Sequence, residues 1–259
     1  MSVEALVLRE ECDGIVTLTL NRPKQQNALS EAMLDQLQAE LDAVGRNPRA
    51  RVVVLGGTGP NFCAGHDLKE MRSRPDRRYY QRLFEQCSRM MWSLVELPQP
   101  VIAKVRGIAT AAGCQLVAMC DLAVATKAAR FATSGIDVGL FCSTPAVPIS
   151  RNVSRKRAFE MLVTGEFLAA EMARDFGLVN RVVPDAGLDA AVTDLAHKIV
   201  GKSPSVVTSG KRMFYAQLDM PFERAVAYAA EVMAGDMMAD DAGEGIDAFI
   251  EKRKPVWKS

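Results

Sequence analysis

Short apolar runs of strand length alternate with longer segments of helical periodicity, and this alternation constrains the fold more than any other feature of the chain. The apolar residues after Ser30, a good N-cap residue, have helical spacing, and so do the apolar residues before Pro98. From about Arg155 onward the pattern is almost wholly helical. Strands alternating with helices predict an α/β core, followed here by a helical region. The strand-like runs cover residues 15–20, 52–55, 101–105 and 122–125.

Composition narrows the class of protein. With 259 residues and 49% hydrophobic content, the chain can bury one large core or a core with an appended helical part. The 32 basic and 31 acidic residues nearly balance, so no nucleic-acid partner is implied. The apolar runs are short or interrupted by charge, which argues against a membrane span. The first six residues are unlike a signal or transit peptide, so we expect a cytoplasmic protein.

The cysteines and histidines do not form metal-binding patterns. His66 and His197 lie far apart in the sequence, and no structural zinc site is expected. Five of the six cysteines lie among apolar residues without any C-x-x-C pair, which predicts reduced, buried thiols. These five are Cys63, Cys87, Cys114, Cys120 and Cys142.

Two strand ends lead into loops of small residues. The strand before Gly56 is followed by the segment 61–69, and the strand before Gly107 is followed by the segment 111–121, which begins a helix. Small residues let a ligand approach the backbone, and free amides at a helix start can receive negative charge. A site for an anion or a developing oxyanion is one explanation. Tight packing of strand against helix also selects alanine and glycine.

The stretches F-C-A-G-H-D-L-K-E, from Phe62, and A-A-G-C-Q-L-V-A-M-C-D, from Ala111, together resemble the crotonase superfamily of enoyl-CoA hydratases and isomerases. Further matching segments extend the resemblance over nearly the whole chain, and several are similar to a divergent branch that includes the mitochondrial enoyl-CoA hydratase domain-containing proteins of vertebrates. The resemblance implies a spiral of repeated strand-strand-helix units in residues 1–200. A helical oligomerisation region in 201–259 would build a homotrimer or a dimer of trimers.

The resemblance also implies an oxyanion hole for a thioester carbonyl. Its two backbone amides would belong to His66 and Ala112, with Gly113 beside them. Relatives carry alanine at the position of His66 and glycine at the position of Ala112. Because the backbone is used, these replacements need not destroy the hole. The His66 imidazole could act as an acid or base, but a hydrogen bond at the entrance or an orientation away from the site is the favoured interpretation.

Coenzyme A would bind as part of an acyl-CoA substrate or ligand, and no metal or redox cofactor is implied. Each charged candidate is also explained as a solvated surface residue, so their placement in one site depends on the resemblance. Lys254 is expected to come from a neighbouring subunit. The implied coenzyme A contacts are Lys24, Ala28, Leu29, Ala64, Lys69 and Lys254.

At both positions where hydratases carry catalytic glutamates, the resemblance places residues without a carboxylate, Gln115 and Gly135. An amide can position water but cannot usefully exchange a proton near pH 7. Asp137 would share the face of Gly135 in an extended segment, although a structural role is favoured. Ser143 could bind substrate or water. Two classes remain open: a weak hydratase, isomerase or thioester hydrolase, and a non-catalytic acyl-CoA-binding or scaffold protein.

Overall fold

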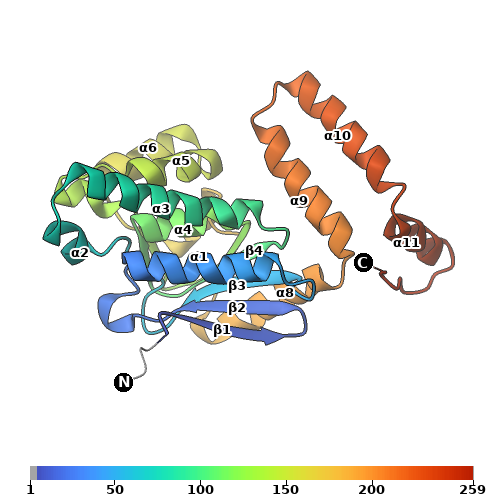
Figure 1. Cartoon of the computed structure of the whole chain (residues 1–259), viewed down its shortest axis with the longest axis horizontal. Coiled ribbons are helices and arrows are strands. Elements are labelled where there is room, and N and C mark those ends of the chain that lie inside the picture. Colours follow the sequence, from blue (N-terminus) through green and yellow to red (C-terminus); the bar gives the residue numbers. More distant parts are fainter. Residues whose placement is uncertain (1–4, 259) are drawn as a thin grey trace.

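The computed structural model describes residues 5–258, and its core is a six-stranded sheet (Figure 1). Of the first six residues, on which the expectation about a signal or transit peptide is based, positions 1–4 lie outside the described part. The first two strands are antiparallel, and every later neighbouring pair is parallel. In spatial order the strands are β1 (Val7–Cys12), β2 (Ile15–Leu20), β3 (Val52–Gly57), β4 (Val101–Val105), β6 (Leu122–Thr126) and β9 (Arg181–Val183).

A second sheet has three short strands, β5 (Ile108–Thr110), β7 (Arg130–Ala132) and β8 (Leu168–Ala169). β5 and β7 are parallel, and β8 is antiparallel to β7. β4 is followed directly by β5, and β6 by β7, so each successive strand pair contributes one strand to each sheet. This arrangement places the ends of β3 and β5 close together.

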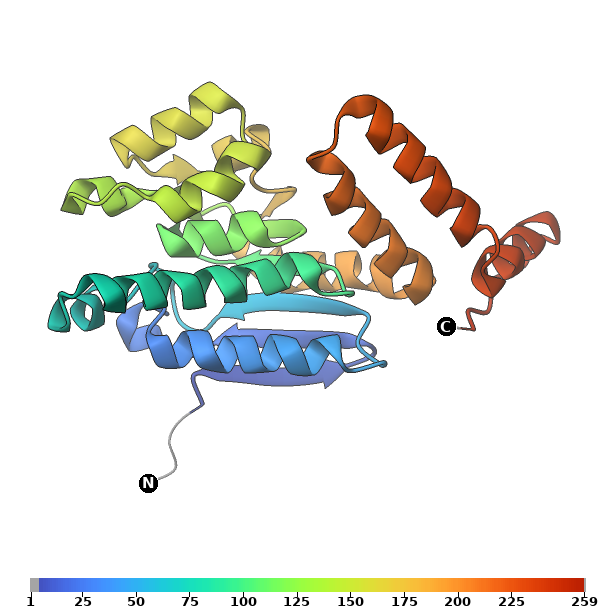
Figure 2. The same ribbon diagram turned by 45° about the horizontal axis from the view of Figure 1, so that its top comes forward.

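Helices cover both faces of the large sheet (Figure 2). Alternate residues of β3 face two separate apolar clusters because neighbouring strand side chains point to opposite faces. Val52 and Val54 pack with α8 (Leu188–Val200), whereas Val53 and Leu55 lie in the larger cluster with α1, α3 and α4. These three helices span Glu31–Gly45, Arg77–Glu96 and Ala112–Met119. The smaller elements are η1 (Pro23–Gln25), α2 (Leu68–Ser73), η2 (Ser134–Val138), α5 (Ser143–Asn152), α6 (Arg155–Thr164), α7 (Ala170–Asp175) and η3 (Asp185–Gly187).

The predicted α/β core followed by helices is confirmed, and so are several details. Ser30 caps α1, because its Oγ accepts the amide of Met33 at 3.2 Å. The five cysteines predicted to be buried are buried free thiols, and burial raises the pKa of the Cys63 thiol to about 12. No helix within residues 5–258 combines the length and apolar character needed to cross a membrane.

The prediction of an almost wholly helical chain after Arg155 is wrong at two places. The two-residue strand β8 extends the small sheet, and the three-residue strand β9 pairs with β6 at the edge of the large one. Such short strands cannot display a period of two residues over the window that pattern analysis needs. Their pairing depends on partners far away in the sequence: Leu168 pairs with Phe131, and Arg181 pairs with Val124.

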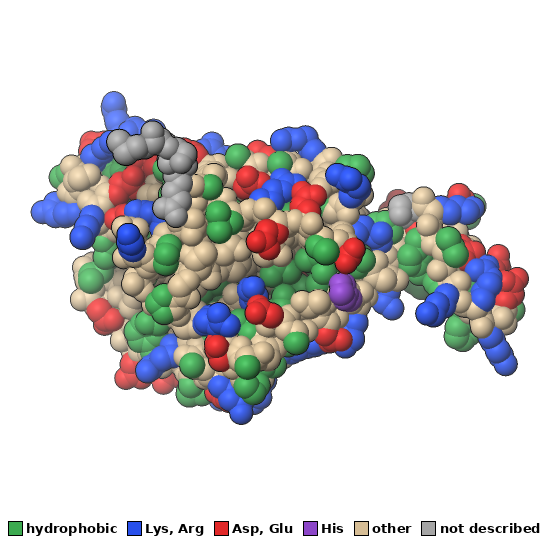
Figure 3. Space-filling model, turned by 90° about the horizontal axis from the view of Figure 1, so that it is seen from below, with side chains coloured by type: hydrophobic (Ala, Val, Ile, Leu, Met, Phe, Trp, Pro, Cys, Tyr) green, Lys and Arg blue, Asp and Glu red, His purple; other side chains and the backbone are tan. Residues whose placement is uncertain are grey.

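The last helices, α9 (Pro204–Leu218), α10 (Phe222–Asp236) and α11 (Asp240–Ile250), form a helical arm that extends from the core (Figures 1 and 3). The arm has almost no buried apolar residues of its own: α9 has none, α10 buries only Ala225, and the one buried apolar residue of α11 is Ala248. Phe222 and Phe249 are 86% and 85% exposed. Packing within the chain therefore does not explain the apolar surface of the arm. The division at residue 200 into two functional units stays a prediction.

Two sets of polar contacts fix the arm. Near its middle, Lys211 of α9 donates to Asp121, just after α4, at 2.8 Å. At its base, the Ser203 hydroxyl donates to Asp241 at 2.6 Å, and the Lys258 amide donates to the same carboxylate at 2.7 Å. The Trp257 indole donates to the Gly201 carbonyl at 2.9 Å. The end of the chain is therefore fastened to the point where the arm begins.

Candidate active site

Two loops meet at the carboxyl ends of β3 and β5. The Cys63 amide donates to the Ile108 carbonyl at 3.1 Å, and the Thr110 amide donates to the Cys63 carbonyl at 3.0 Å. Gly113, at the start of α4, lies directly against this contact. A Cβ on Gly113 would lie only 2.1 Å from the Cys63 carbonyl oxygen. Glycine is therefore required there for the two loops to approach each other.

The contact brings two unpaired backbone amides near one another. Within residues 5–258, neither the His66 amide nor the Ala112 amide donates to a protein acceptor. Ala112 is the first residue of α4, and the preceding Ala111 has φ +50° and ψ −121°, a conformation that residues with a side chain rarely adopt. A Cβ on Gly65 would lie 3.2 Å from the Ala112 nitrogen. These two free donors can stabilise an oxyanion if both face one ligand atom.

Both residues line a cavity of about 480 Å³ at this end of the strands. Of the candidate residues, Ala64, His66, Ala112, Gly135 and Ser143 line this cavity. The lining is mostly apolar, as expected for a site that receives an acyl chain. The other lining residues are Leu68, Met71, Phe84, Ala111, Ser134, Val138, Leu140, Phe141, Cys142, Thr144 and Pro145.

The nitrogens of the His66 imidazole are buried, although the residue as a whole is half-buried. Its ring packs edge-to-face against Phe84 of α3, with the ring centroids 5.5 Å apart. Both ring nitrogens are covered by protein atoms, and neither makes a hydrogen bond of good geometry among the described residues, although the Leu29 carbonyl lies near enough to influence the ring. Burial lowers the pKa of His66 to about 4, against the opposing influence of the Leu29 carbonyl. The ring is therefore neutral at pH 7, and an acid-base role that needs titration near neutral pH does not fit this environment.

Gln115 lies one turn into α4 and is only 4% exposed. Its Oε1 has no partner among the described residues, although the side chain is not part of the cavity wall. A buried, unpaired amide oxygen costs free energy comparable to a lost hydrogen bond. The structure therefore buries Gln115 without bringing its side chain to the wall of the cavity.

Gly135 and Asp137 lie in η2, which is a 3₁₀-helix. A Cβ on Gly135 would lie 2.5 Å from the Leu140 carbonyl oxygen and 2.8 Å from the Cys142 sulfur, so no longer side chain fits without a shift of this loop. The expectation that Asp137 shares the face of Gly135 in an extended segment is wrong, because the segment is helical. The Asp137 carboxylate instead lies beside Gly165 and does not line the cavity.

Ser143 begins α5 and is exposed at the cavity, where its hydroxyl donates to the Phe141 carbonyl at 3.4 Å. This hydroxyl has no basic partner in the described hydrogen-bond network. Activation as a nucleophile needs such a partner, so the geometry favours contact with a ligand over covalent chemistry.

Two side chains that the sequence analysis did not single out hold the 21–29 loop against the 58–67 loop. Arg22 donates to Asp67 at 3.1 Å and to a backbone carbonyl of its own loop at 2.8 Å. Asn27, with φ +53°, is fully buried and donates to two carbonyls of the 58–67 loop at 2.8 and 2.9 Å. Both belong to the segment 21–29, where polar loop residues give no periodic signal.

The implied coenzyme A contacts divide into two groups. Ala28, Leu29 and Ala64 lie close together, because the two loops that carry them are paired. The Leu29 amide donates to the Gly65 carbonyl at 2.8 Å, and Leu29 forms an isolated parallel bridge with His66. Lys24, Lys69 and Lys254 are exposed. Lys254 follows α11, and Figure 1 shows α11 and α2 at opposite ends of the molecule. Within one chain, Lys254 therefore lies far from the cavity.

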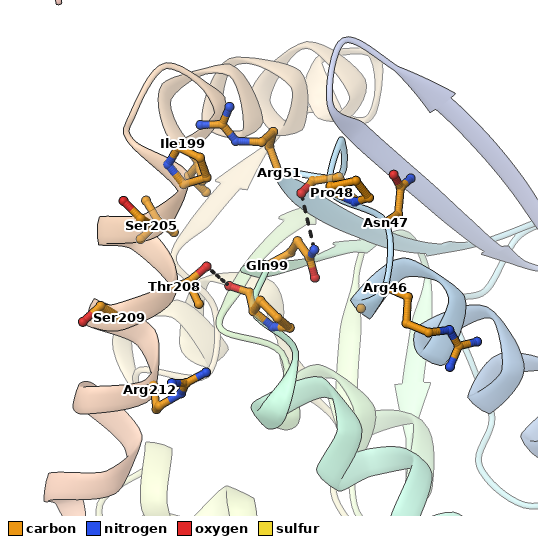
Figure 4. A pocket seen from close by; sticks show the side chains of 15 residues that line it. Arg46, Asn47, Pro48, Arg51, Gln99, Ile199, Ser205, Thr208, Ser209 and Arg212 are labelled. Carbon is orange, nitrogen blue, oxygen red and sulfur yellow. Dashed lines mark hydrogen bonds between the residues drawn. The ribbon is translucent and has the colours of Figure 1, made fainter. Parts of the chain in front are cut away.

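A second cavity, of about 570 Å³, lies between α9 and the loops that precede β3 and β4 (Figure 4). Arg46, Arg51 and Arg212 are among its lining residues. It lies at the amino ends of the parallel strands, opposite the two free amides. In open α/β sheets ligands usually bind at the carboxyl ends, and the cavity at His66 is therefore the candidate active site.

Comparison with known proteins places the chain in a family. The family model for enoyl-CoA hydratase/isomerase matches residues 10–259. Rat enoyl-CoA hydratase domain-containing protein 3, mitochondrial, is 45% identical over 245 residues, which cover 95% of this chain and 82% of the relative. An enoyl-CoA hydratase structure from Mycobacterium smegmatis is 56% identical with a TM-score of 0.97, covering 99% of this chain and 100% of that one. The human domain-containing protein 3 structure is 44% identical with a TM-score of 0.95, covering 98% and 100%. The chain therefore belongs to the enoyl-CoA hydratase/isomerase family and has its α/β crotonase fold with C-terminal helices.

Proposed function

We propose that this protein binds acyl-CoA thioesters in the cavity at His66 and polarises the thioester carbonyl with the amides of His66 and Ala112. The observation that carries the proposal is the pair of backbone donors without protein acceptors, which belong to two residues that line the same apolar cavity. Fixed donors in a site protected from water stabilise negative charge on a carbonyl oxygen more than solvent does. Ala28, Leu29 and Ala64 would contact coenzyme A, with Lys24 and Lys69 near its phosphates.

We infer that any reaction of the bound thioester is one of the reactions of this family and is slow. Gln115 and Gly135 stand at the positions where the resemblance puts the two hydratase glutamates, and neither supplies a carboxylate. An isomerase or a thioester hydrolase would use the same carbonyl polarisation. The crowding at Gly135 favours a second candidate, a non-catalytic acyl-CoA-binding protein, because a catalytic side chain has no room there.

The binding proposal predicts a specific loss in Gly113→Ala. Calorimetric titration of the unmodified protein with butyryl-CoA should show saturable binding that is tighter than the binding of free coenzyme A. Gly113→Ala should weaken butyryl-CoA binding by about tenfold or more, because the new Cβ conflicts with the Cys63 carbonyl and separates the two loops.

Gly210→Ala is the matched control. Gly210 lies in α9 with open space around its Cα, so alanine there should leave binding unchanged. Absence of saturable binding to any acyl-CoA by folded, unmodified protein would overturn the proposed function. Equal affinity for coenzyme A and butyryl-CoA would refute recognition of the thioester carbonyl.

We further propose that the apolar surface of the helical arm packs against other copies of the chain in a trimer or a pair of trimers. Phe222, Met233, Phe249 and Ile250 are each at least 70% exposed in the single chain, and exposed apolar surface of this kind marks an interface. Light scattering at micromolar concentration should give three or six times the chain mass of 28.2 kDa. A monomer mass would contradict this assembly. In it, Lys254 could reach a neighbouring cavity.

The cytoplasmic location expected from the sequence stays a prediction. Some relatives carry names that place them in mitochondria, whereas a bacterial chain is more similar in sequence. Neither comparison assigns a compartment to this chain.

A further inference from the structure

The corner between α2 and α3 carries a local excess of positive charge. Residues 69–89 include seven basic and three acidic residues, although the whole chain is nearly balanced at 32 and 31. Two of these acids are engaged: Glu70 accepts the Glu31 amide at 3.0 Å, and Asp76 accepts the Tyr79 amide at 2.9 Å and so caps α3. Five exposed arginines of this corner, here called the arginine face, form no ion pair within residues 5–258: Arg72, Arg77, Arg78, Arg82 and Arg89.

The arginine face is broad. Arg78, Arg82 and Arg89 lie at helical intervals, so they share the side of α3 that is opposite the buried Cys87. Glu85 lies on the same side and offsets only one of the three charges. Because α3 rises about 1.5 Å per residue, Arg78 and Arg89 are about 17 Å apart along its axis. The positive charge therefore covers a surface and is not concentrated at one point.

The stability of α3 does not explain these charges. Arg77 and Arg78 lie in its first turn, which contains no acidic residue. The first turn of a helix carries a partial positive charge, so cations there are unfavourable. No ion pair with another described residue compensates for this. A contact outside the chain therefore accounts for the two arginines better than local stability does.

The arginine face borders the candidate active site. Leu68 and Met71 of α2 and Phe84 of α3 line the cavity, and Leu68 is 54% exposed, which places it at the cavity rim. The arginines themselves line none of the four cavities described among residues 5–258, so no groove for a small anion lies between them. Figure 1 shows α2 at the end of the molecule opposite the helical arm.

We propose that the arginine face binds the surface of an anionic lipid bilayer, with the cavity rim at Leu68 held against the headgroups. Anionic headgroups form an extended plane of negative charge, which matches cations spread along a helix and needs no groove. The exposed Leu68 side chain enters the headgroup region. One coenzyme A headgroup at the cavity does not reach across the same face.

The use of this contact rests on the proposed function. Each CH₂ group of an acyl chain favours the bilayer, so long-chain acyl-CoA thioesters reside largely in membranes. A protein whose thioester cavity opens beside a membrane-bound face meets these ligands where they are concentrated. The bilayer contact itself requires no acyl-CoA and is tested without it.

The test is co-sedimentation of the full-length protein with lipid vesicles. Vesicles of phosphatidylcholine with about one-third phosphatidylserine should bind at least about 100-fold more tightly than pure phosphatidylcholine, because each cation near such a surface strengthens binding about fivefold. Raising sodium chloride from about 0.1 M to about 1 M shortens the screening length from about 10 Å to about 3 Å and should abolish binding. The triple variant Arg77→Gln, Arg78→Gln, Arg82→Gln should bind the anionic vesicles about 100-fold more weakly.

The control triple variant is Arg46→Gln, Arg49→Gln, Arg212→Gln, which removes three exposed charges from the α1–β3 loop and from α9. It should keep the affinity of the unmodified protein for anionic vesicles. Equal binding of neutral and anionic vesicles, or equal losses in the two triple variants, overturns the proposal. Binding of soluble polyglutamate without binding of vesicles assigns the face to an acidic protein and overturns it as well.

Calorimetric titration with butyryl-CoA in the absence of vesicles separates this inference from the proposed function. The Arg77, Arg78 and Arg82 triple variant should bind butyryl-CoA as tightly as the unmodified protein. A tenfold loss would assign these arginines to the coenzyme and overturn the lipid contact. Intact butyryl-CoA binding without vesicle binding refutes this inference alone, whereas vesicle binding without any acyl-CoA binding refutes only the proposed function.

Discussion

Hydration of crotonyl-CoA by the unmodified protein is expected to be at least about 10³-fold slower than by a family hydratase that has both carboxylates. Each general acid or base commonly contributes about 10²- to 10⁴-fold, and Gln115 and Gly135 supply neither. The measurement is the rate of formation of chromatographically verified 3-hydroxybutyryl-CoA, with both enzymes assayed together. Fast hydration by this protein would show that its reaction does not need the two carboxylates. His66 and Ser143 would then be the next residues to test.

Restoring carboxylates should not repair the activity. Gln115→Glu is isosteric but returns only one of two groups that act on one water, so we expect a gain of about tenfold or less. Gly135→Glu should destabilise the protein, because its Cβ would meet the Leu140 carbonyl at 2.5 Å. Gly210→Glu, placed in open space on α9, is the matched control and should remain folded. A double variant that regains hydratase rates would show that the loop at Gly135 adapts.

Replacing Lys211 by methionine is expected to lower the free energy of unfolding by about 3–5 kcal/mol. The Lys211 and Asp121 side chains are 6% and 14% exposed, so methionine would leave a largely buried carboxylate without its countercharge. Lys211 also donates to the carbonyls of Leu94 and Gln99 at 2.8 and 3.1 Å. Burial lowers the pKa of Lys211, whereas the charge of Asp121 opposes that effect.

Lys198→Met is the control for this measurement, because Lys198 forms an exposed pair with Asp194 on α8. Such pairs contribute about 0.3–0.5 kcal/mol. Urea unfolding is measured at one protein concentration, because the stability of an assembled protein depends on concentration, and light scattering of each variant checks that its assembly is unchanged. If the two substitutions have equally small effects, Lys211 does not anchor the arm.

The central strands could be predicted from sequence because they are continuously apolar. β3 and β4 are buried on both faces, and their strand character is visible without a partner. β1 could not be predicted in this way: it lies at the sheet edge, and its sequence V-L-R-E-E-C is mostly solvent-facing. Its existence depends on pairing with β2, which local periodicity does not encode.

The site shows a similar division. The family resemblance identified His66 and Ala112 as neighbours, although nothing in their sequence spacing requires it. Their proximity depends on the unusual φ of Ala111 and on the close packing of Gly113, which only the folded chain displays. Asp137 was misplaced because an extended segment and a 3₁₀-helix point the same residue in different directions. The burial of the His66 ring nitrogens was likewise beyond prediction, since Phe84 comes from a separate helix.

The contacts of Trp257 and Lys258 join the two ends of the helical arm. Trp257 contacts Gly201 directly, whereas Lys258 contacts Asp241, which also accepts from Ser203. Farther along α9, Lys211 joins the arm to Asp121. Asp121 lies just after α4, whose opposite end presents the Ala112 amide. In the proposed trimer, a force that a neighbouring subunit exerts on the arm would therefore pass through Lys211, Asp121 and α4 to one of the two proposed oxyanion donors.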